Sequence, residues 1–376
     1  MNLKSIFLLF CIVLLLTMIG CEKDSPVESD NLTLEQEIDN LASQYVKVGA
    51  MVGIIDKSQT RHVFSYGAKL TGTDNPPDAN TLFGIGSITK TFTTTLLAEM
   101  YLENPNSDEI VQHYLPPDRV TLPTRNGTEI TFVHLATHTS GIPRTPHEDG
   151  SPFPRVAGYD PQNPYAAYTT DEVYDYLTNY AELEFEPGTY WEYSNTGVGL
   201  LGHVLGLIDG TSYETILQRD IFNVLGMEHS SLFVTEELSA NAATGHDRTY
   251  SPVPYYTAND IFQGCGHIKS TLNDMFIYLE AQLGITETSL LDAMDLTHQP
   301  VMHQGSMGEQ CIGWFMIELD DGQKIIYSGG DTNGFSAYIG FNKELRTGAI
   351  ILLNASFHDS TNLSMGPEIM KAIYRH

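Results

Sequence analysis

The chain has 376 residues, of which 41% are hydrophobic and 10% aromatic, and 47 acidic against 19 basic residues give a net charge of −28. This apolar content argues against disorder, and the length predicts two lobes or subdomains rather than one core. So acidic a surface, without any basic run, would repel phosphates and argues against nucleic acid as a partner. The excess of carboxylates fits an exported, soluble domain.

The N-terminus has the pattern of a targeting segment. Lys4 precedes an apolar run over residues 6–19 that is too short for a comfortable membrane span. The run ends in a small residue before Cys21, which resembles the bacterial lipobox, where the cysteine is acylated and becomes the new N-terminus. We therefore expect a lipoprotein signal peptide over 1–20, a lipid on Cys21, a polar tether over 21–31, and membrane anchoring in the cell envelope. An ordinary signal peptide with a chance cysteine is the alternative.

The pattern over residues 32–376 predicts one domain of the size of a catalytic domain, with strands at both ends of the segment and helices between them. A capping box at 33–36 opens the first helix, and a hairpin follows. The middle, about 81–309, alternates helical segments with Pro- and Gly-marked loops. The predicted strands are 50–55, 61–66, 312–318, 323–327, 335–341 and 347–353, and a helix closes the chain. This pattern predicts an α/β (α+β) fold with an antiparallel sheet built from both termini, flanking helices and an inserted helical lobe.

The strongest chemical signal is Ser-Ile-Thr-Lys at residues 87–90. Residues three apart share one helix face, so the amine of Lys90 can reach the hydroxyl of Ser87. A serine hydroxyl attacks well only when a neighbouring group takes its proton, and a desolvated lysine can do this. The motif is the only Ser-x-x-Lys in the chain, and it opens a helix with an apolar stripe.

The chain's only Tyr-x-Asn lies at residues 193–195, before a glycine-rich helical stretch. The phenol of Tyr193 can relay a proton to a leaving group, and the amide of Asn195 can bind polar atoms of a substrate. Taken alone, a buried tyrosine and an N-cap asparagine fit these residues better.

A third element lies at Tyr327, Ser328, Gly329 and Gly330, at the end of a predicted strand. Glycines there let backbone N–H groups approach a substrate carbonyl, as an oxyanion hole requires. Taken alone, a Gly-Gly hairpin turn is the better interpretation.

In this order the three elements resemble the serine β-lactamase and penicillin-binding-protein superfamily. The Tyr-x-Asn variant resembles the class C β-lactamases, the D-alanyl-D-alanine carboxypeptidases and related esterases. The stretches 83–93, 133–143, 225–227 and 313–314 also match family landmarks, so the resemblance runs from about Leu34 to the C-terminus. Residues 126–130 look closest to the carboxypeptidase/endopeptidase branch that acts on peptidoglycan.

The resemblance implies acyl transfer through a covalent serine ester, with no metal or organic cofactor. Neutral Lys90 would take the proton of Ser87, and the N–H groups of Ser87 and Gly330 would hold the oxyanion. Tyr193 would pass a proton to the leaving group, and Asn195 would orient the substrate.

One departure concerns the third motif, which the family begins with Lys or His. If the motif is Tyr327-Ser-Gly, one extra residue follows it; if it is Ser328-Gly-Gly, the spacing fits, but a serine replaces the cation. Either alignment lacks the positive group that would hold a substrate carboxylate, which weakens the expectation of β-lactam turnover.

We therefore expect a serine hydrolase that acts on D-Ala-type peptidoglycan peptides or β-lactams. An esterase or amidase on other small substrates, or a non-catalytic sensor that kept the fold, are the alternatives. His134 and His138 stand four apart without the glutamate of a zincin motif, so no metal site is expected. Cys265 and Cys311 stay undecided between free thiols and a disulfide.

Overall fold

The computed structural model describes residues 32–376 except 108, 148–150, 304–307, 321 and 357–360. The predicted signal peptide (1–20), the lipid on Cys21 and the tether (21–31) lie outside the described residues. Within the described part, no helix is both long enough and apolar enough to span a bilayer.

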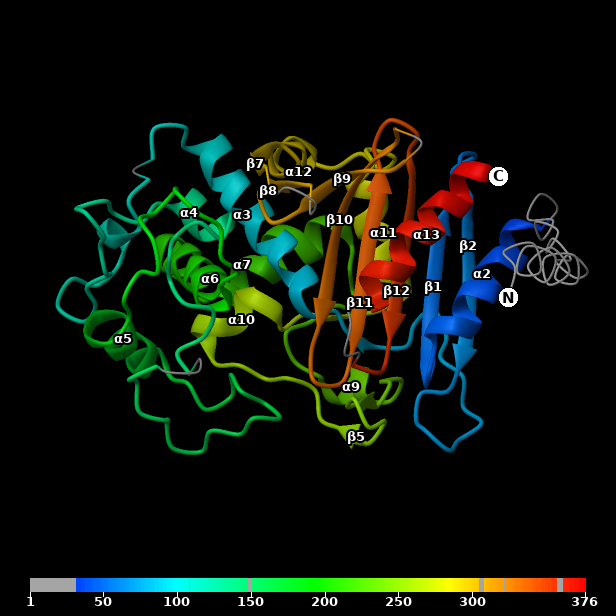
Figure 1. Ribbon diagram of the computed structural model, residues 1–376, viewed down its shortest axis with the longest axis horizontal. Helices are drawn as coiled ribbons and strands as arrows, with labels where there is room; N and C mark the ends of the chain where they lie inside the picture. The colour runs from blue at the N-terminus through cyan, green and yellow to red at the C-terminus, as the bar shows by residue number, and fades with distance from the viewer. Residues whose placement is uncertain (1–31, 108, 148–150, 304–307, 321, 357–360) are drawn as a thin grey trace, which may run out of the picture.

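One antiparallel sheet joins the two ends of the chain, in the order β2-β1-β12-β11-β10-β9-β8-β7 (Figure 1). β1 (Gly49–Ile55) pairs with β2 (Arg61–Gly67) as the predicted hairpin, and on its other edge with β12 (Thr347–Leu353). The further strands are β11 (Ser336–Asn342), β10 (Lys324–Asp331), β9 (Phe315–Glu318), β8 (Glu309–Cys311) and β7 (Pro300–His303). The predicted fold class, with a sheet built from both termini, is confirmed.

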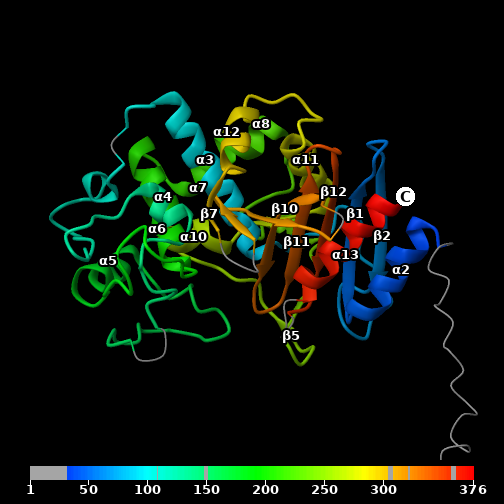
Figure 2. The ribbon, with the colours of Figure 1, turned by 45° about the horizontal axis from the view of Figure 1, so that its top comes forward.

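Two helices from opposite ends of the chain cover one face of this sheet (Figures 1 and 2). α2 (Leu34–Tyr45) begins at the predicted capping box, and it packs with α13 (Thr361–Arg375) against inward-facing strand residues. Fully burying each such aliphatic side chain contributes about 1.5–3 kcal/mol. The layer formed by α2 and α13 packs against this face of the sheet and thereby fixes the position of β10.

The helical lobe lies beside the sheet, and α11 covers the sheet's second face (Figure 2). Its helices are α3 (Thr89–Glu103), η2 (Val111–Tyr114), α4 (Phe132–Ala136), α5 (Thr170–Asn179), α6 (Asn195–Asp209), α7 (Tyr213–Ile216), η3 (Leu217–Phe222), α8 (Asn223–Leu225), α9 (Glu236–Ser239), α10 (Asp260–Gly266), α11 (Leu272–Gln282) and α12 (Leu291–Thr297). Two short pairs complete it, β3 (Phe83–Gly84) with β6 (Lys269–Ser270), and β4 (Gly245–His246) with β5 (Pro252–Val253).

Three predicted boundaries need correction. The main sheet resumes at Pro300, so the lobe ends before residue 309; β7 has only four, mostly exposed residues and no alternating pattern that would announce a strand. β9 begins at Phe315 rather than 312, after a bend over 312–313. β10 continues to Asp331, because its glycines stay in the ladder with β11 instead of turning.

α3 runs between the sheet and the rest of the lobe and is buried over most of its length, from Thr89 to Ala98. Its threonines satisfy their hydroxyls within the helix or against its neighbours. Thr91 donates to the carbonyl of Ile88, and Thr93 donates to that of Gly264 on α10. A helix held on all sides in this way keeps its first turn in a fixed place.

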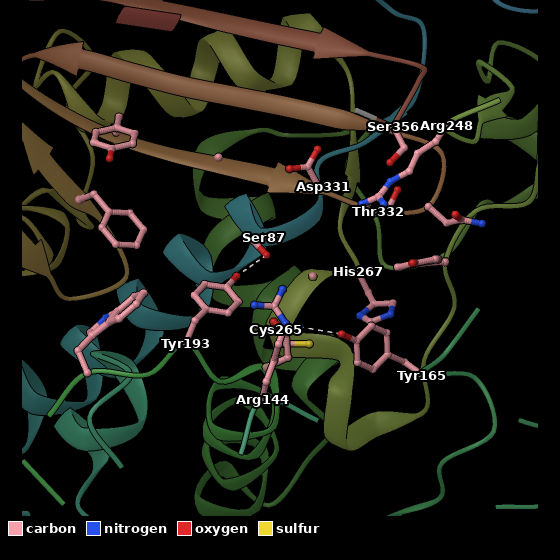
Figure 3. A pocket seen from close by; sticks show the side chains of 18 residues that line it. Ser87, Arg144, Tyr165, Tyr193, Arg248, Cys265, His267, Asp331, Thr332 and Ser356 are labelled. Atoms are coloured by element: carbon pink, nitrogen blue, oxygen red, sulfur yellow. Dashed lines mark hydrogen bonds between the residues drawn. The ribbon is translucent and has the colours of Figure 1, made fainter. Parts of the chain in front are cut away.

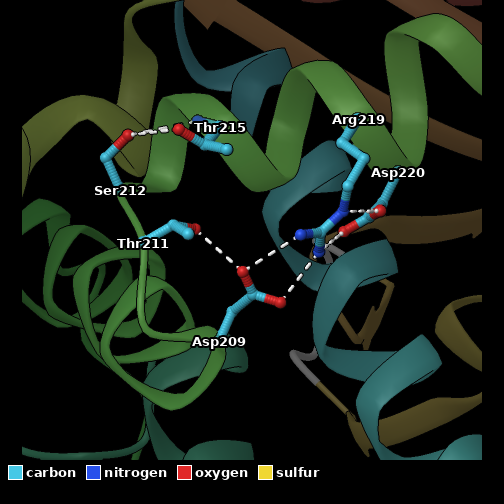
Figure 4. Close-up of polar contacts among 6 residues, drawn as sticks. All are labelled: Asp209, Thr211, Ser212, Thr215, Arg219 and Asp220. Carbon is cyan, nitrogen blue, oxygen red and sulfur yellow. Dashed lines mark hydrogen bonds and ion pairs between the residues drawn. The ribbon is translucent and has the colours of Figure 1, made fainter.

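A charged cluster on the lobe surface ties the end of α6 to the π-helical turn η3 (Figure 4). The guanidinium of Arg219 contacts Asp209 at 2.8 Å and Asp220 at 2.6 Å, and the hydroxyl of Thr211 donates to Asp209. Exposed pairs of this kind contribute little to stability, because water screens their charges. One cation serves two carboxylates here, so negative charge is in excess.

Glu99 on α3 is sensitive to this excess. Burial raises the pKa of Glu99 to about 7, and the charges of Asp220 and Glu103 act in the same direction. The folded state then binds more protons than the unfolded state between about pH 4.5 and 7, so stability falls as pH rises through this window.

Glu99→Gln should remove that fall and raise the free energy of unfolding at pH 8 by about 2 kcal/mol, with little change at pH 5. Denaturant unfolding at pH 5 and at pH 8 measures this change in the free energy of unfolding. Glu214→Gln, an exposed residue, controls for net charge. Equal effects of Glu99→Gln at pH 5 and pH 8 would contradict the prediction.

Candidate active site

Ser87 lies on a 3₁₀ turn, η1 (Gly86–Ile88), that leads directly into α3. Gly86 has φ +50°, and a Cβ there would lie 2.7 Å from the backbone nitrogen of Asp331, so only glycine fits this approach. The first intrahelical N–H bonds start after Ser87, at Ile88, which donates to Ile85. The N–H of Ser87 is therefore directed away from the helix at its positive end.

The amine of Lys90 lies beside the hydroxyl of Ser87. Its Nζ is 3.0 Å from Ser87 Oγ, 2.9 Å from Asn195 Oδ1 and 2.5 Å from the carbonyl oxygen of Cys265. Two N–H groups serve the two carbonyl-type oxygens, so the remaining tetrahedral position faces Ser87. In the neutral amine that position is a lone pair, which can accept the serine proton.

Tyr193 is a second neighbour of the same hydroxyl, with its Oη 2.6 Å from Ser87 Oγ. The residue that follows it, Ser194, is the N-cap of α6 and accepts the N–H of Gly197. Asn195 is thus the first helical residue rather than the cap, and its Nδ2 donates to Tyr165 Oη at 2.7 Å. The start of α6 therefore aims both motif side chains at Ser87.

His138 holds the Tyr193 loop in place. Its Nδ1 accepts the N–H of Ser194, and its ring packs 4.3 Å from that of Tyr193. Burial lowers the pKa of His138 well below its ordinary value, and the charges of Lys90 and Arg144 act in the same direction, so the imidazole is neutral. The role of His138 is therefore to support the position of the Tyr193 loop.

The other histidine of the four-apart pair, His134, accepts the N–H of Thr131 through its Nδ1 in a capping box. Across the described residues, no group of three or more His, Cys, Asp or Glu side chains is placed to hold a metal ion. Cys265 and Cys311 are buried free thiols, and burial raises their pKa values to about 11 and about 12. They do not form a disulfide.

Side-chain alternation along β10 decides between the two alignments of the third motif. Tyr327 stands opposite Gly340, Gly329 stands opposite Tyr338, and the ring of Tyr338 packs under Gly366 of α13. Tyr327 and Gly329 therefore point toward the α2 and α13 layer, where the Tyr327 ring stacks on Tyr338, although both also border the cavity.

Ser328 and Gly330 point to the opposite face, toward the nucleophile. A Cβ on Gly330 would lie 2.7 Å from the backbone nitrogen of Ser87 and would overlap the carbonyl oxygen of Ile85. Ser328 is buried on the same face. The gap-free alignment, Ser328-Gly329-Gly330, is thus the one that the structure favours, and a serine stands where the family has its cation.

The oxyanion donor expected from Gly330 needs correction. Thr332 donates its N–H to the carbonyl of Phe335, directly before β11, and in an antiparallel pair the donors alternate between the two edges. Gly330 therefore directs its N–H toward β11, whereas Asp331 directs its N–H to the edge that faces Ser87. β9 pairs with β10 only as far as Tyr327, so within the described residues no strand covers that edge. The N–H groups of Ser87 and Asp331 form the candidate oxyanion hole.

These groups open into a cavity of about 880 Å³ (Figure 3). It is lined by Ser87, Arg144, Tyr165, Trp191, Tyr193, Asn195, Arg248, Tyr256, Cys265, Gly266, His267, Phe315, Tyr327, Gly329, Asp331, Thr332, Asn333 and Ser356. Sequence reasoning missed Arg144, Tyr165, Arg248 and Asp331, which stand on loops or strand ends far apart in the chain. One signal was available, because Arg144 directly follows the landmark at 133–143.

Gly330→Ala should lower kcat/KM at least 100-fold, because the added methyl group displaces β10 from Ser87 and widens the oxyanion hole. Tyr327→Phe, on the opposite face of the same strand, should change kcat/KM less than threefold. Steady-state hydrolysis of an activated ester, with circular dichroism to verify folding, measures both. The reverse ranking would favour the alignment that starts at Tyr327.

Comparison with known proteins agrees with this geometry. The Beta-lactamase family model matches residues 34–371. A "Beta-lactamase" of Pseudomonas fluorescens is 25% identical, covering 90% of this chain and 98% of the relative. The "D-alanyl-D-alanine-carboxypeptidase/endopeptidase AmpH" of Escherichia coli (strain K12) is 26% identical, covering 82% of this chain and 80% of the relative. A solved class C β-lactamase superposes with a TM-score of 0.76 at 24% identity, covering 90% of this chain and 96% of its own. The predicted superfamily is confirmed, and with it an enzyme of the serine hydrolase class, while the class C structure shows that the fold is shared: the chain belongs to the Beta-lactamase family.

Proposed function

We propose that the protein hydrolyses D-Ala-type peptides or β-lactams through an acyl-enzyme on Ser87. One observation carries this proposal: Ser87 Oγ lies within hydrogen-bonding distance of both Lys90 Nζ, at 3.0 Å, and Tyr193 Oη, at 2.6 Å, at the edge of an open cavity. The names of the relatives from Pseudomonas fluorescens and Escherichia coli support the substrate class.

The first half-reaction forms the ester. Ser87 Oγ attacks the carbonyl carbon and forms a C–O bond, while its proton passes to the neutral amine of Lys90. The carbonyl oxygen becomes negative, and the N–H groups of Ser87 and Asp331 bind it, a device that contributes about 3–4 kcal/mol per donor. The C–N bond then breaks, and the nitrogen leaves with the proton that Tyr193 supplies.

The second half-reaction releases the acyl group. Water attacks the ester carbon, its proton returns through the same pair of groups, and the C–O bond to Ser87 breaks. Asn195 orients the substrate: its Oδ1 accepts from Lys90 and its Nδ2 donates one N–H to Tyr165, which leaves the second N–H of the amide for a substrate oxygen. No organic cofactor takes part in these steps.

An esterase or amidase on other small substrates is the second candidate. It is favoured by Ser328, which occupies the position of the third-motif cation and cannot bind a carboxylate by charge. The non-catalytic sensor has less support, since the serine, the amine and the phenol are all within hydrogen-bonding distance.

A fluorescent penicillin and a nitrophenyl ester distinguish these candidates. Stable labelling or β-lactam turnover at Ser87 is expected, and Ser87→Ala should abolish labelling and lower ester hydrolysis at least 1,000-fold. Ser43→Ala, an exposed serine on α2, is the control. Ester hydrolysis without labelling would favour the esterase, and full activity of Ser87→Ala would rule out the mechanism.

We also propose that the mature protein is a lipoprotein of the cell envelope, anchored through Cys21. The lipobox-like end of the apolar run over 6–19 and the polar stretch after it support this proposal.

Cys21→Ala should move the protein from the membrane fraction to the soluble fraction, and mass spectrometry should find acyl chains on Cys21 of the unmodified protein. Cys311→Ala, a buried position in the domain, controls for loss of a thiol. Cleavage elsewhere with an unacylated Cys21 would contradict the anchor.

A further inference from the structure

The cavity around Ser87 is electropositive, although acidic residues outnumber basic ones 47 to 19 in the chain. Among the described residues that line it, Arg144 and Arg248 are the cations and Asp331 is the one carboxyl. Asp331 is buried and accepts a hydrogen bond from Ser336; burial raises its pKa, while that hydrogen bond and the charge of Arg248 act in the opposite direction. His267 is neutral, because burial lowers its pKa to about 3.

Neither of these arginines forms an ion pair with any described residue. Four arginines outside the cavity pair with carboxylates, at Arg61–Glu280, Arg119–Asp171, Arg219–Asp209 and Arg375–Glu37, whereas Arg125 donates to the backbone carbonyl of Leu183 and Arg155 lies over the ring of Tyr159. With such an excess of acidic side chains, two unpaired guanidiniums facing one cavity are charges available to a ligand.

Arg248 is held beside the end of β10 by a well-ordered hairpin. The carboxylate of Asp247 accepts the N–H groups of Thr249 and Ser251, so it is used by the turn and does not pair with Arg248. His246 of β4 donates its N–H to Gly334, in the β10–β11 turn. This bond fixes the hairpin to the strand that carries the third motif.

Figure 3 shows the guanidinium of Arg248 next to Thr332 and Ser356, and Arg144 below Ser87 in this view. The Arg144 guanidinium lies 4.7 Å from the centre of the Tyr193 ring, and the backbone carbonyl of Arg144 accepts the N–H of Asn195. A ligand bonded to Ser87 therefore shares the cavity with two cations.

We propose that Arg248 binds the substrate carboxylate and thereby replaces the cation that Ser328 lacks, while Arg144 adds to the positive field. The substrates are then anionic acyl donors rather than neutral esters. This inference rests on the proposed function only in placing the ligand at Ser87. A guanidinium on a loop offers a carboxylate two parallel N–H bonds, which a serine hydroxyl on the strand does not.

Binding without turnover tests the proposal. In the Ser87→Ala background, calorimetry compares an N-acyl-D-alanyl-D-alanine peptide with its C-terminal amide, which differs only in the carboxylate. We expect the carboxylate to bind at least tenfold more tightly, and less so at high salt. Arg248→Gln should bring the affinity ratio close to one, and Arg248→Lys should retain part of it.

Arg119→Gln, which removes an exposed arginine outside the cavity, should keep the full ratio and serves as the matched control. A ratio near one in the Ser87→Ala protein, an unchanged ratio in Arg248→Gln, or no binding of either peptide would overturn the proposal. Because the assay needs no catalysis, absence of hydrolysis by the unmodified protein would contradict the proposed function alone.

Discussion

The buried amine of Lys90 is the interaction on which the site depends. Its three partners come from three separate segments: Ser87 before α3, Asn195 at the start of α6, and the carbonyl of Cys265 on α10. An unsatisfied amine in this position would cost several kcal/mol, so the three segments must pack in this arrangement for the amine to be buried at all. The same contacts that stabilise the lobe therefore align the nucleophile with its proton acceptors.

A second constraint is the close approach of β10 to η1. Gly86 and Gly330 face each other's backbones, and a side chain on either would push the strand away from Ser87. This contact brings the N–H groups of Ser87 and Asp331 to the same edge. In the proposed mechanism the helical lobe supplies the nucleophile Ser87 and the sheet supplies the second oxyanion donor, so both parts of the fold are needed for catalysis.

Charge is distributed in the same cooperative way. The surface is acidic overall, and exposed arginines are mostly neutralised by nearby carboxylates, whereas the cavity keeps Arg144 and Arg248 without such partners. An acidic exterior with a positive cavity directs anionic ligands to one place, because field lines concentrate in a concave site with low-dielectric walls. The family's third-motif cation is thus not needed on the strand itself.

Local sequence patterns determined much of this protein. The capping box at 33–36, the hairpin and the apolar runs of β11 and β12 each depend on neighbouring residues, as does the pairing of Ser87 with Lys90 one helical turn later. The tertiary structure alone decided the features that depend on distant segments. The register of β10 on β11 selected Ser328 over Tyr327 as the motif's first residue and Asp331 over Gly330 as the N–H donor. The fold brought Arg144 and Arg248 to the cavity of Ser87 from loops about a hundred residues apart, and no short-range pattern encodes such a meeting because side-chain proximity across a fold is set by packing.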